Sequence, residues 1–528
     1  MSGLLVHLLS ASVLISSASA AESAIREILT SGRLEGARRQ SFSAHRVVLA
    51  DAYDSRSGDF LWIEGTHPRL EALRVIEALG RVGARGLDPR DYEVTLLSTL
   101  APQLGDPPLL ARFDVGLSVA VVRYVSDLHA GKVRQKGVRF DFGAPAKLDL
   151  TEKLLEAARS GQLLDRVERP PPVMLQTQLL EAQLARYQKL AGSSTVTSLK
   201  LPPKVGRAES FAEAPNLAAW LTALGDLPTS TASHSTYDAK LVDAVKRFQL
   251  RHGLEVDGEL GRATRKALEV PAARRARQIE LALERLRWAP ALEGPRVVLV
   301  NIPSFRLMAF DLLSPRRGPA LQMSVVVGRA MATETPVFSG EVTSLVFAPF
   351  WHVPRSITKN ELLPKLRSDL GILAAQDFEI VQEGRVLPAN GASLDLLETG
   401  AAKLRQKPSA KNALGRLKFV FPNSRNIYLH ETPSQRGFEA ARRDFSHGCI
   451  RLEDPAALAR WMLEPDGWDA ADVDHALAAS KTRVVTLGAP VPVILIYSTA
   501  VARPDGTIRF FEDIYGHDVR LERALRAE

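Results

Sequence analysis

The spacing of apolar residues divides the chain into regions of different periodicity. Over residues 21–190, Ala, Leu, Arg and Glu dominate, and apolar residues recur at steps of three and four, as in 70–82 and 114–128. This spacing places apolar side chains on one face of each helix. The pattern predicts a helical N-terminal domain over 21–190, without a cluster of chemically reactive residues.

A linker and a small helical module are expected next. The stretch 191–204 is rich in Ser, Thr, Pro and Lys, which is typical of a linker. One helical face then carries the apolar residues Leu241, Ala244, Val245 and Phe248. The string AVKRFQLRHGLEVDGELGRATRKAL resembles the peptidoglycan-binding-domain-1 repeat, a unit of three helices. This resemblance implies a wall-binding module over 201–270, with a plain spacer as the alternative.

From about residue 297 the apolar period changes to two, which is typical of strands. Strands are expected at 297–302, 306–310, 323–327, 341–347, 417–421, 426–430, 483–487 and 491–497. A helical and irregular segment, 352–407, interrupts them. The pattern predicts a mostly-β sandwich over 295–500 with an insertion, followed by a C-terminal extension over 501–528. The fold class is therefore expected to be multidomain α+β.

The insertion 352–407 is far longer than an ordinary connection between strands, and loops of that size in enzymes are often lids. Within it, one helical face is expected to carry Leu362, Leu363, Leu366 and Leu370. Three basic residues, Lys359, Lys365 and Arg367, are candidates to meet carboxylates of a substrate. We expect a mobile cap, with a static subdomain as the alternative.

The N-terminus has the features of an export signal. Residues 4–15 form an apolar stretch too short to span a bilayer, and Ala18-Ser19-Ala20 fits cleavage after Ala20. A signal peptide over 1–20 places the mature protein in the periplasm; an uncleaved segment would instead anchor it in the inner membrane. No later stretch is long and apolar enough for a stable membrane span.

The overall composition is that of a folded soluble protein, with 45% hydrophobic and 24% charged residues. The net charge of +8 favours an anionic partner. The densest basic run, 265–287, is interrupted by glutamates, so nucleic acid is not an expected partner. Exported proteins usually hold cysteines in disulfide pairs, and the single cysteine, Cys449, therefore stands out as a candidate reactive thiol.

Two expected strands sort their polar residues onto one face. Along 426–430, alternation turns Ile427 and Leu429 to the core and leaves Tyr428 and His430 together on the other face.

The second strand carries the cysteine. Along 446–452, the same alternation turns Ile450 to the core and places His447, Cys449 and Arg451 together on the opposite face. The sequence thus predicts that polar groups of both strands meet.

These residue types suit a nucleophilic thiol. A cysteine reacts as the thiolate and titrates near pH 8.5 when free, so Cys449 needs a histidine or a positive charge beside it. His430, His447 and Arg451 are the candidates. Gly448 permits close approach of a substrate, and the amides of Gly448 and Cys449 are candidate donors to an oxyanion. In outline this is a Cys/His acyl-transfer site.

The motifs YLHETP and SHGCIRL resemble the signature of the YkuD-type L,D-transpeptidases. The surrounding strings VNIPSFRL, VVVGRAMATETPVFSGEV, FAPFWHVPRSI and NALGRLKFVFPN extend the resemblance. The chain is similar to the large periplasmic subtype, which has a helical scaffold, a peptidoglycan-binding module and a lidded catalytic domain.

The resemblance implies roles for individual residues. Cys449 matches the acylated nucleophile and His430 the histidine paired with it, whereas His447 matches a second, supporting histidine. Ser446, Gly448 and Arg451 complete the motif, and Tyr428 and Trp351 match aromatic residues of the substrate cleft. The group that orients His430 stays open between candidates such as a backbone carbonyl, because alternation points Glu431 to the other face.

The implied reaction uses peptidoglycan stem peptides as donor and acceptor. A donor tetrapeptide is cut between diaminopimelate at position three and D-Ala at position four. The resulting cysteine thioester is resolved by an amine of a second stem, which gives a 3→3 cross-link. The resemblance implies no metal and no organic cofactor.

Other functions fit parts of the pattern. A zinc hydrolase would use His430, His447 and Cys449 as ligands, but a second ligand pair and an H-E-x-x-H motif are lacking. A non-catalytic wall-binding protein would keep only the fold. Within the enzyme class, water as acceptor gives an L,D-carboxypeptidase, and a protein lysine gives attachment of an outer-membrane protein to the wall.

Overall fold

The computed structural model describes residue 20 and residues 22–527, except 57, 168–170, 194–198, 230–233, 291–293 and 315–317. The signal peptide expected over 1–20 lies outside the described residues, apart from Ala20. Within the described ranges, no helix has both the length and the apolar character needed to cross a membrane.

Helix α5 (Pro107–Ala130) forms the centre of the N-terminal domain and is buried along most of its length. It begins after Asp106, whose carboxylate accepts a hydrogen bond from Leu109 N at 2.9 Å. The elements around it are a helix over 22–31, α2 (Arg46–Asp54), β1 (Ile63–Glu64), β2 (His67–Pro68), α3 (Leu70–Gly80), α4 (Val94–Leu100) and α6 (Leu150–Ser160). The expected helical character is confirmed.

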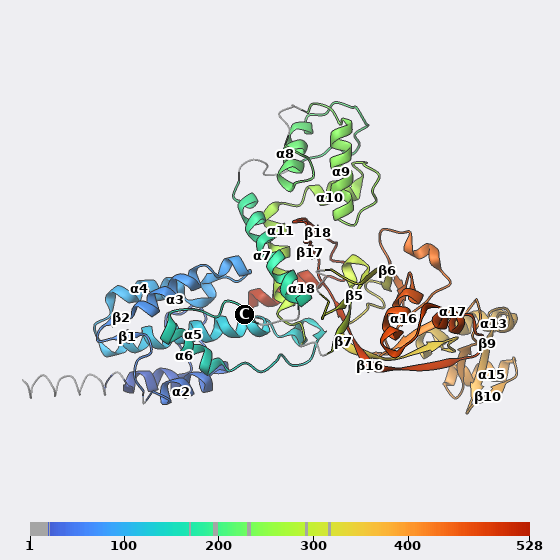
Figure 1. Cartoon of the computed structure of the whole chain (residues 1–528), viewed down its shortest axis with the longest axis horizontal. Helices are drawn as coiled ribbons and strands as arrows, with labels where there is room; N and C mark the ends of the chain where they lie inside the picture. The colour runs from blue at the N-terminus through green and yellow to red at the C-terminus, as the bar shows by residue number, and fades with distance from the viewer. Residues whose placement is uncertain are drawn as a thin grey trace, which may run out of the picture.

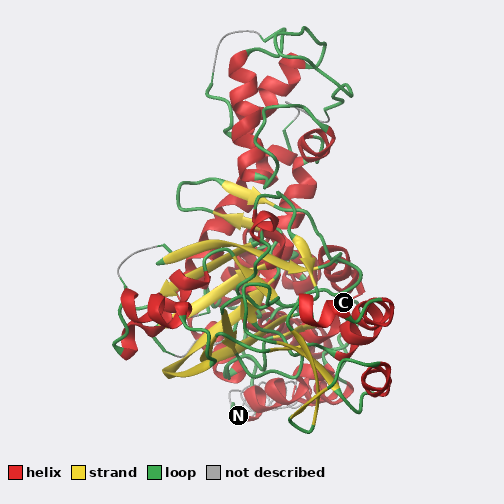
Figure 2. Cartoon of the chain, turned by 90° about the vertical axis from the view of Figure 1, so that its right-hand side faces the viewer, coloured by secondary structure: helices red, strands yellow, loops and turns green. Residues whose placement is uncertain are grey.

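Two long helices, α7 (Pro171–Ala191) and α11 (Ala272–Leu286), pack side by side and carry the small module at one end (Figures 1 and 2). The module consists of α8 (Ala214–Leu224), α9 (Ala239–Arg251) and α10 (Arg262–Leu268), as its three-helix prediction requires. The expected linker differs in part, because Leu199 and Leu201 are buried in the core of this module.

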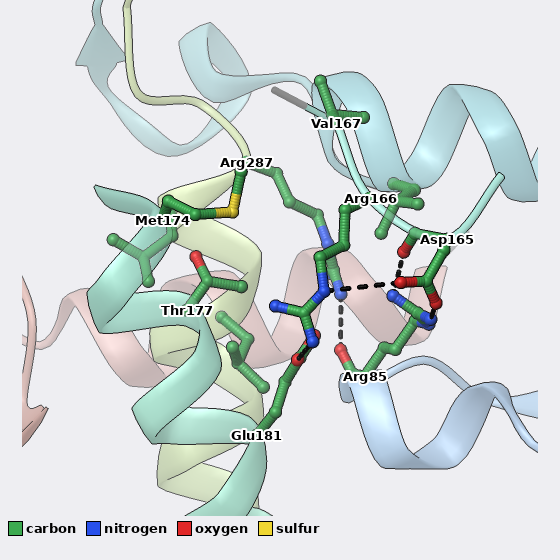
Figure 3. A pocket seen from close by; sticks show the side chains of 11 residues that line it. Arg85, Asp165, Arg166, Val167, Met174, Thr177, Glu181 and Arg287 are labelled. Carbon is green, nitrogen blue, oxygen red and sulfur yellow. Dashed lines mark hydrogen bonds and ion pairs between the residues drawn. The ribbon is translucent and has the colours of Figure 1, made fainter. Parts of the chain in front are cut away.

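The N-terminal domain meets the helix pair at a cavity lined by charged side chains (Figure 3). Arg166 Nη2 lies 3.2 Å from Glu181 Oε2 of α7, and Arg85 pairs with Asp165. Arg287, at the end of α11, donates through Nη2 to the Arg85 carbonyl at 2.6 Å. These interactions tie the helix pair to the N-terminal domain.

The largest sheet closes on itself. Its strands are β3 (Phe140–Asp141), β4 (Arg296–Asn301), β5 (Arg306–Asp311), β6 (Leu321–Gly328), β7 (Val337–Phe347), β12 (Leu417–Val420), β13 (Leu429–His430), β14 (Asp444–Ser446), β15 (Ile450–Leu452) and β16 (Arg483–Ile496). From β12 the order is β12–β13–β15–β6–β5–β4–β16–β7, and β7 pairs with β12 again. The mostly-β expectation is confirmed, with the two expected layers joined into one closed sheet.

Four expected strands differ in detail. The stretches 483–487 and 491–497 belong to the single strand β16, whose register shifts between Thr486 and Val491. Of 426–430, only Leu429–His430 is a strand, and 446–452 is interrupted at 447–449. Helices α16 (Pro455–Leu463) and α17 (Ala470–Ala478) contribute buried apolar residues to the core of the same domain.

The insertion is a folded unit with its own core. It contains β8 (Trp351–His352), α12 (Arg355–Ile357), a π-helix (Thr358–Leu362), α13 (Leu363–Ser368), α14 (Gly371–Ala375), β9 (Phe378–Gln382), β10 (Arg385–Leu387), α15 (Gly391–Thr399) and β11 (Lys403–Gln406). A sheet in the order β10-β9-β11-β8 replaces the irregular segment that the sequence predicted. Leu363 and Leu366 are buried as expected, but Leu370 lies beyond the end of α13 and is exposed.

The C-terminal segment bridges two parts of the molecule. Its hairpin of β17 (Ala500–Ala502) and β18 (Ile508–Phe510) packs in the core shared by the module and the helix pair. Tyr515 and Leu521, the latter on α18 (His517–Ala527), pack instead in the core of the large sheet.

Candidate active site

Strands β13 and β15 lie side by side and bring the two polar faces together. They run parallel, with Leu429 opposite Ile450 and His430 opposite Arg451. Leu429 and Ile450 are fully buried, and their burial sets which residues face the other way. The alternation predicted from the sequence thus holds for the strand residues.

The loop 447–449 between β14 and β15 is a tight turn around one hydroxyl. Ser446 Oγ accepts from Gly448 N at 3.1 Å and donates to the Cys449 carbonyl at 2.6 Å. Gly448 has φ +115°, a conformation that side-chain-bearing residues rarely adopt. The turn removes one expected oxyanion donor, because the Gly448 amide is already bonded to Ser446.

Cys449 is half-buried beside polar and positive groups. Its Sγ lies 3.6 Å from the Asn426 carbonyl, and the Tyr428 hydroxyl lies beside the thiol. Burial raises the pKa of the Cys449 thiol, while hydrogen bonds from Tyr428 and the charges of Lys418 and Arg451 partly oppose that shift. The resting site therefore favours the neutral thiol.

His430 is buried and held by the backbone. Its Nδ1 contacts the carbonyl of Glu431, while the Glu431 side chain pairs with Arg416 at 2.7 Å and points away, as alternation predicts. Burial, with a smaller effect of Arg451, lowers the pKa of His430 to about 3. Among the described residues, His430 and Cys449 share no hydrogen bond. The distance between a catalytic base and its nucleophile is often long in the free protein and shortens only when substrate binds.

His447 lies in a different environment. It is exposed, and its Nε2 lies 2.7 Å from Glu361 Oε1 of the insertion. The structure thus separates the two histidines, one buried beside the strands and one facing the insertion. Among the described residues, no group of three or more His, Cys, Asp or Glu is placed to hold a metal ion, as the zinc alternative would require.

The two aromatic residues predicted from the resemblance do meet. Trp351, on β8 of the insertion, lies close enough to the Tyr428 hydroxyl to lower the pKa of that group. The Tyr428 ring lies 5.7 Å from that of His430, measured between centroids. An aromatic wall therefore connects the insertion to the strands that carry His430 and Cys449.

Lys418 is a site residue that the sequence analysis missed. It lies on β12 opposite His430, and its Nζ is 3.9 Å from the centroid of the Tyr428 ring. Burial lowers the pKa of its ammonium group. Alternation along 417–420, with Leu417 and Phe419 in the core, contained the signal that would have found it.

Three family models match successive parts of the chain. Residues 295–493 match the family model described as the L,D-transpeptidase catalytic domain (YkuD). Residues 48–184 match a scaffold domain, and residues 213–268 match a putative peptidoglycan binding domain. The chain therefore carries a YkuD-type L,D-transpeptidase catalytic domain together with a scaffold domain and a peptidoglycan-binding domain.

One curated relative is a putative L,D-transpeptidase of Haemophilus influenzae, 29% identical over 248 residues. The match covers 47% of this chain and 49% of that protein, so the chain spans about half the length of this relative.

Two solved structures of L,D-transpeptidases are also similar. That of Mycobacterium tuberculosis L,D-transpeptidase 3 is 15% identical, covers 40% of this chain and 66% of that one, and has a TM-score of 0.18. That of the Stackebrandtia nassauensis L,D-transpeptidase is 14% identical, covers 60% of this chain and 100% of that one, and has a TM-score of 0.22.

A pH profile of thiol alkylation tests the electrostatics of Cys449. Because Cys449 is the single cysteine, iodoacetamide uptake by the whole protein reports on it. We expect a midpoint above the value of about 8.5 for free cysteine, because burial raises the pKa of the thiol. Lys418→Met should raise the midpoint further, by up to about one unit, because a cation that favours the thiolate is removed.

Lys481→Met, at an exposed position, is the matched control and should leave the midpoint of alkylation unchanged. His430 should add no inflection between about pH 5 and 7, because an imidazole with a pKa of about 3 is neutral throughout that range. A wild-type midpoint below that of free cysteine, or one indifferent to Lys418→Met, would contradict this description.

Proposed function

We propose that this protein is an L,D-transpeptidase that forms 3→3 cross-links in peptidoglycan through a thioester on Cys449. The observation that carries the proposal is the placement of the sole cysteine. Cys449 lies within the range matched as a catalytic domain, on a tight turn beside Tyr428, Lys418 and Arg451. The Tyr428 hydroxyl and the two cations favour the thiolate and so oppose the effect of burial.

His430 acts as the base in this proposal. Because the Glu431 carbonyl accepts from Nδ1, the lone pair of the neutral ring is on Nε2. Nε2 takes the Cys449 proton as the sulfur attacks the carbonyl carbon of residue three. The proton then goes to the amine of the departing D-Ala, and the C–N bond breaks to leave a thioester.

The second half-reaction reverses these roles. The acceptor amine attacks the thioester carbonyl, loses a proton to His430, and expels the sulfur, which recovers that proton as the thiol. Throughout, the Cys449 amide is the candidate donor to the oxyanion, because the Gly448 amide is bonded to Ser446.

Lys418 and Arg451 are proposed to bind carboxylates of the donor stem. Both are half-buried, and within the described part of the chain neither forms an ion pair with an acidic side chain. A partly buried cation without an anionic partner is costly, and a substrate carboxylate would compensate both charges. Trp351 and Tyr428 form the proposed apolar wall of the same cleft.

The insertion 352–407 is proposed to cap the thioester. Two contacts support this proposal: Glu361 with His447 at 2.7 Å, and Trp351, on the strand that leads into the insertion, with Tyr428. Of its basic residues, Arg367 already pairs with Asp395 at 2.8 Å and Glu398 at 2.6 Å, so Lys359 and Lys365 are the better candidates to meet substrate.

Hydrogen exchange tests the cap. Acylation of Cys449 by a carbapenem is expected to increase protection in 352–407, because a closed cap excludes water. Glu361→Gln should lower protection around the π-helix before acylation, because the contact with His447 weakens. Glu383→Gln, at the exposed β9–β10 turn, is the matched control. Unchanged hydrogen exchange in 352–407, in a protein shown to be acylated, would mean that the insertion is a static subdomain.

The remaining domains fit the same proposal. The three-helix module is proposed to bind the wall, and a cleaved signal peptide over 1–20 is proposed to place the enzyme in the periplasm. The expected boundaries, 21–190, 201–270 and 295–500 with an extension over 501–528, are proposed as the domain limits.

Muropeptide analysis tests the function and the choice of acceptor. The protein is expressed in a Gram-negative host whose own enzymes of this class are deleted, with Cys449→Ala as the control. We expect 3→3 dimers that are absent from the control. Tripeptide stems alone would identify an L,D-carboxypeptidase, and stems linked to protein lysine would identify attachment of an outer-membrane protein. A wall identical to the control overturns the proposal.

A further inference from the structure

The carbonyl of Gly448 is held by a residue far away in the sequence. Thr335 Oγ1 donates to it at 2.7 Å and accepts from Gly328 N at 2.8 Å. Thr335 is fully buried, so water does not compete for these hydrogen bonds. The two bonds fix the hydroxyl between the end of β6 and the loop that carries Cys449.

The backbone at Gly328 allows this arrangement only without a side chain. A Cβ added there would lie 2.0 Å from the Thr333 carbonyl and 2.7 Å from Thr335 N. The chain 329–335 therefore folds closely over the end of β6. From this position Thr333 Oγ1 also donates to the Ser446 carbonyl at 2.9 Å.

Tyr515 supports Thr335 from the C-terminal segment. Its buried hydroxyl donates to the Gly328 carbonyl at 2.5 Å and accepts from Thr335 N at 3.3 Å. Tyr515 is fixed in turn, because its amide donates to Tyr497 Oη at 2.9 Å, and Tyr497 donates to Asp513 at 2.7 Å. Tyr515 thus stands on a network that joins the sheet to the C-terminal segment.

We propose that Thr335 and Tyr515 are positioning residues that aim the Cys449 amide at the oxyanion of the acylation reaction. A trans peptide is planar, with its C=O and N–H on opposite sides. Holding the Gly448 carbonyl toward Thr335 therefore turns the Cys449 N–H away from it. Among the described residues that N–H has no hydrogen-bond partner, so it is available to a ligand.

The inference rests on the proposed function, because only acyl transfer needs this donor. Attack by the sulfur forms the S–C bond and moves the carbonyl π electrons onto oxygen, where the aimed N–H stabilises the charge. Alkylation by iodoacetamide displaces iodide at a saturated carbon and develops no oxyanion. The two reactions use the same sulfur and differ in their need for the amide.

The test compares both reactions in the full chain. Thr335→Val keeps the shape of the side chain but removes the hydroxyl, and is expected to slow carbapenem acylation of Cys449 by about 100-fold, the scale of a misplaced catalytic group. Alkylation should proceed at the wild-type rate. Thr335→Ser should restore most of the acylation rate, and Tyr515→Phe should give a smaller loss than Thr335→Val.

Thr343→Val is the matched control, because the Thr343 hydroxyl also contacts a backbone carbonyl, that of Val420 at 3.5 Å, in another part of the sheet. Wild-type acylation in both Thr335→Val and Tyr515→Phe overturns the inference, as does an equal fall of both reactions. If Thr335→Val does not fold, Tyr515→Phe decides alone. Wild-type protein that is alkylated but never acylated refutes the proposed function instead.

Discussion

Cys449→Ser is expected to abolish cross-linking and the carbapenem adduct, while wild-type protein gains a single adduct at Cys449. A serine hydroxyl ionises far less readily than a thiol, and a neutral His430 with a pKa of about 3 is too weak a base to compensate. Loss of a nucleophile costs on the order of 10⁶-fold in rate. Mass spectrometry of the treated protein and muropeptide analysis give the two readouts.

The fold should survive this change, because Cys449 is half-buried and serine has nearly the same shape. Thermal unfolding of Cys449→Ser should therefore stay within a few degrees of wild type, which corresponds to about 1 kcal/mol or less. Full activity in Cys449→Ala would refute the assignment of the nucleophile and with it the proposed function.

His430→Ala is expected to slow acylation by roughly 100- to 10,000-fold, the range for loss of a general base. His447→Ala should cost clearly less. The structure supplies the reason for this order, because His430 is buried with Nδ1 on a backbone carbonyl, whereas His447 is exposed and faces Glu361. Stopped-flow acylation by a carbapenem measures both variants.

Two further variants separate the roles of the histidines. Glu361→Gln should reproduce the small effect of His447→Ala, because both remove the same contact with the insertion. His352→Ala, which changes an exposed histidine next to Trp351, is the matched control. A larger loss of acylation rate in His447→Ala than in His430→Ala would refute the assignment of His430 as the base.

Alternation was sufficient to predict which residues of β13 and β15 face the core. It rests on burial of Leu429 and Ile450, a local property that the sequence displays directly. It failed at 447–449, because the turn depends on Gly448 at φ +115° and on the Ser446 hydroxyl. A pattern of polar and apolar residues contains no information about such a turn.

Other features depend on contacts between distant parts of the chain. Thr335 and Tyr515 meet only in the folded protein, so no local pattern predicts that they hold Gly448. In the insertion, by contrast, a local signal was present. Strands β9 and β10 flank the two-residue turn Glu383-Gly384, within the segment that was expected to be helical and irregular. Within the expected linker, the apolar residues Leu199 and Leu201 were a similar local signal, because both are buried in the core of the module.

The pairing of α7 with α11 determines how far the three-helix module lies from the large sheet. A module on a flexible linker would sample a broad range of distances from Cys449. Here the module stands on helices, and α7, with 21 residues, is about 30 Å long. A wall strand held by the module would lie at a fixed offset from the stem being acylated. The protein would then fix the distance between the glycan strand that its module binds and each new cross-link.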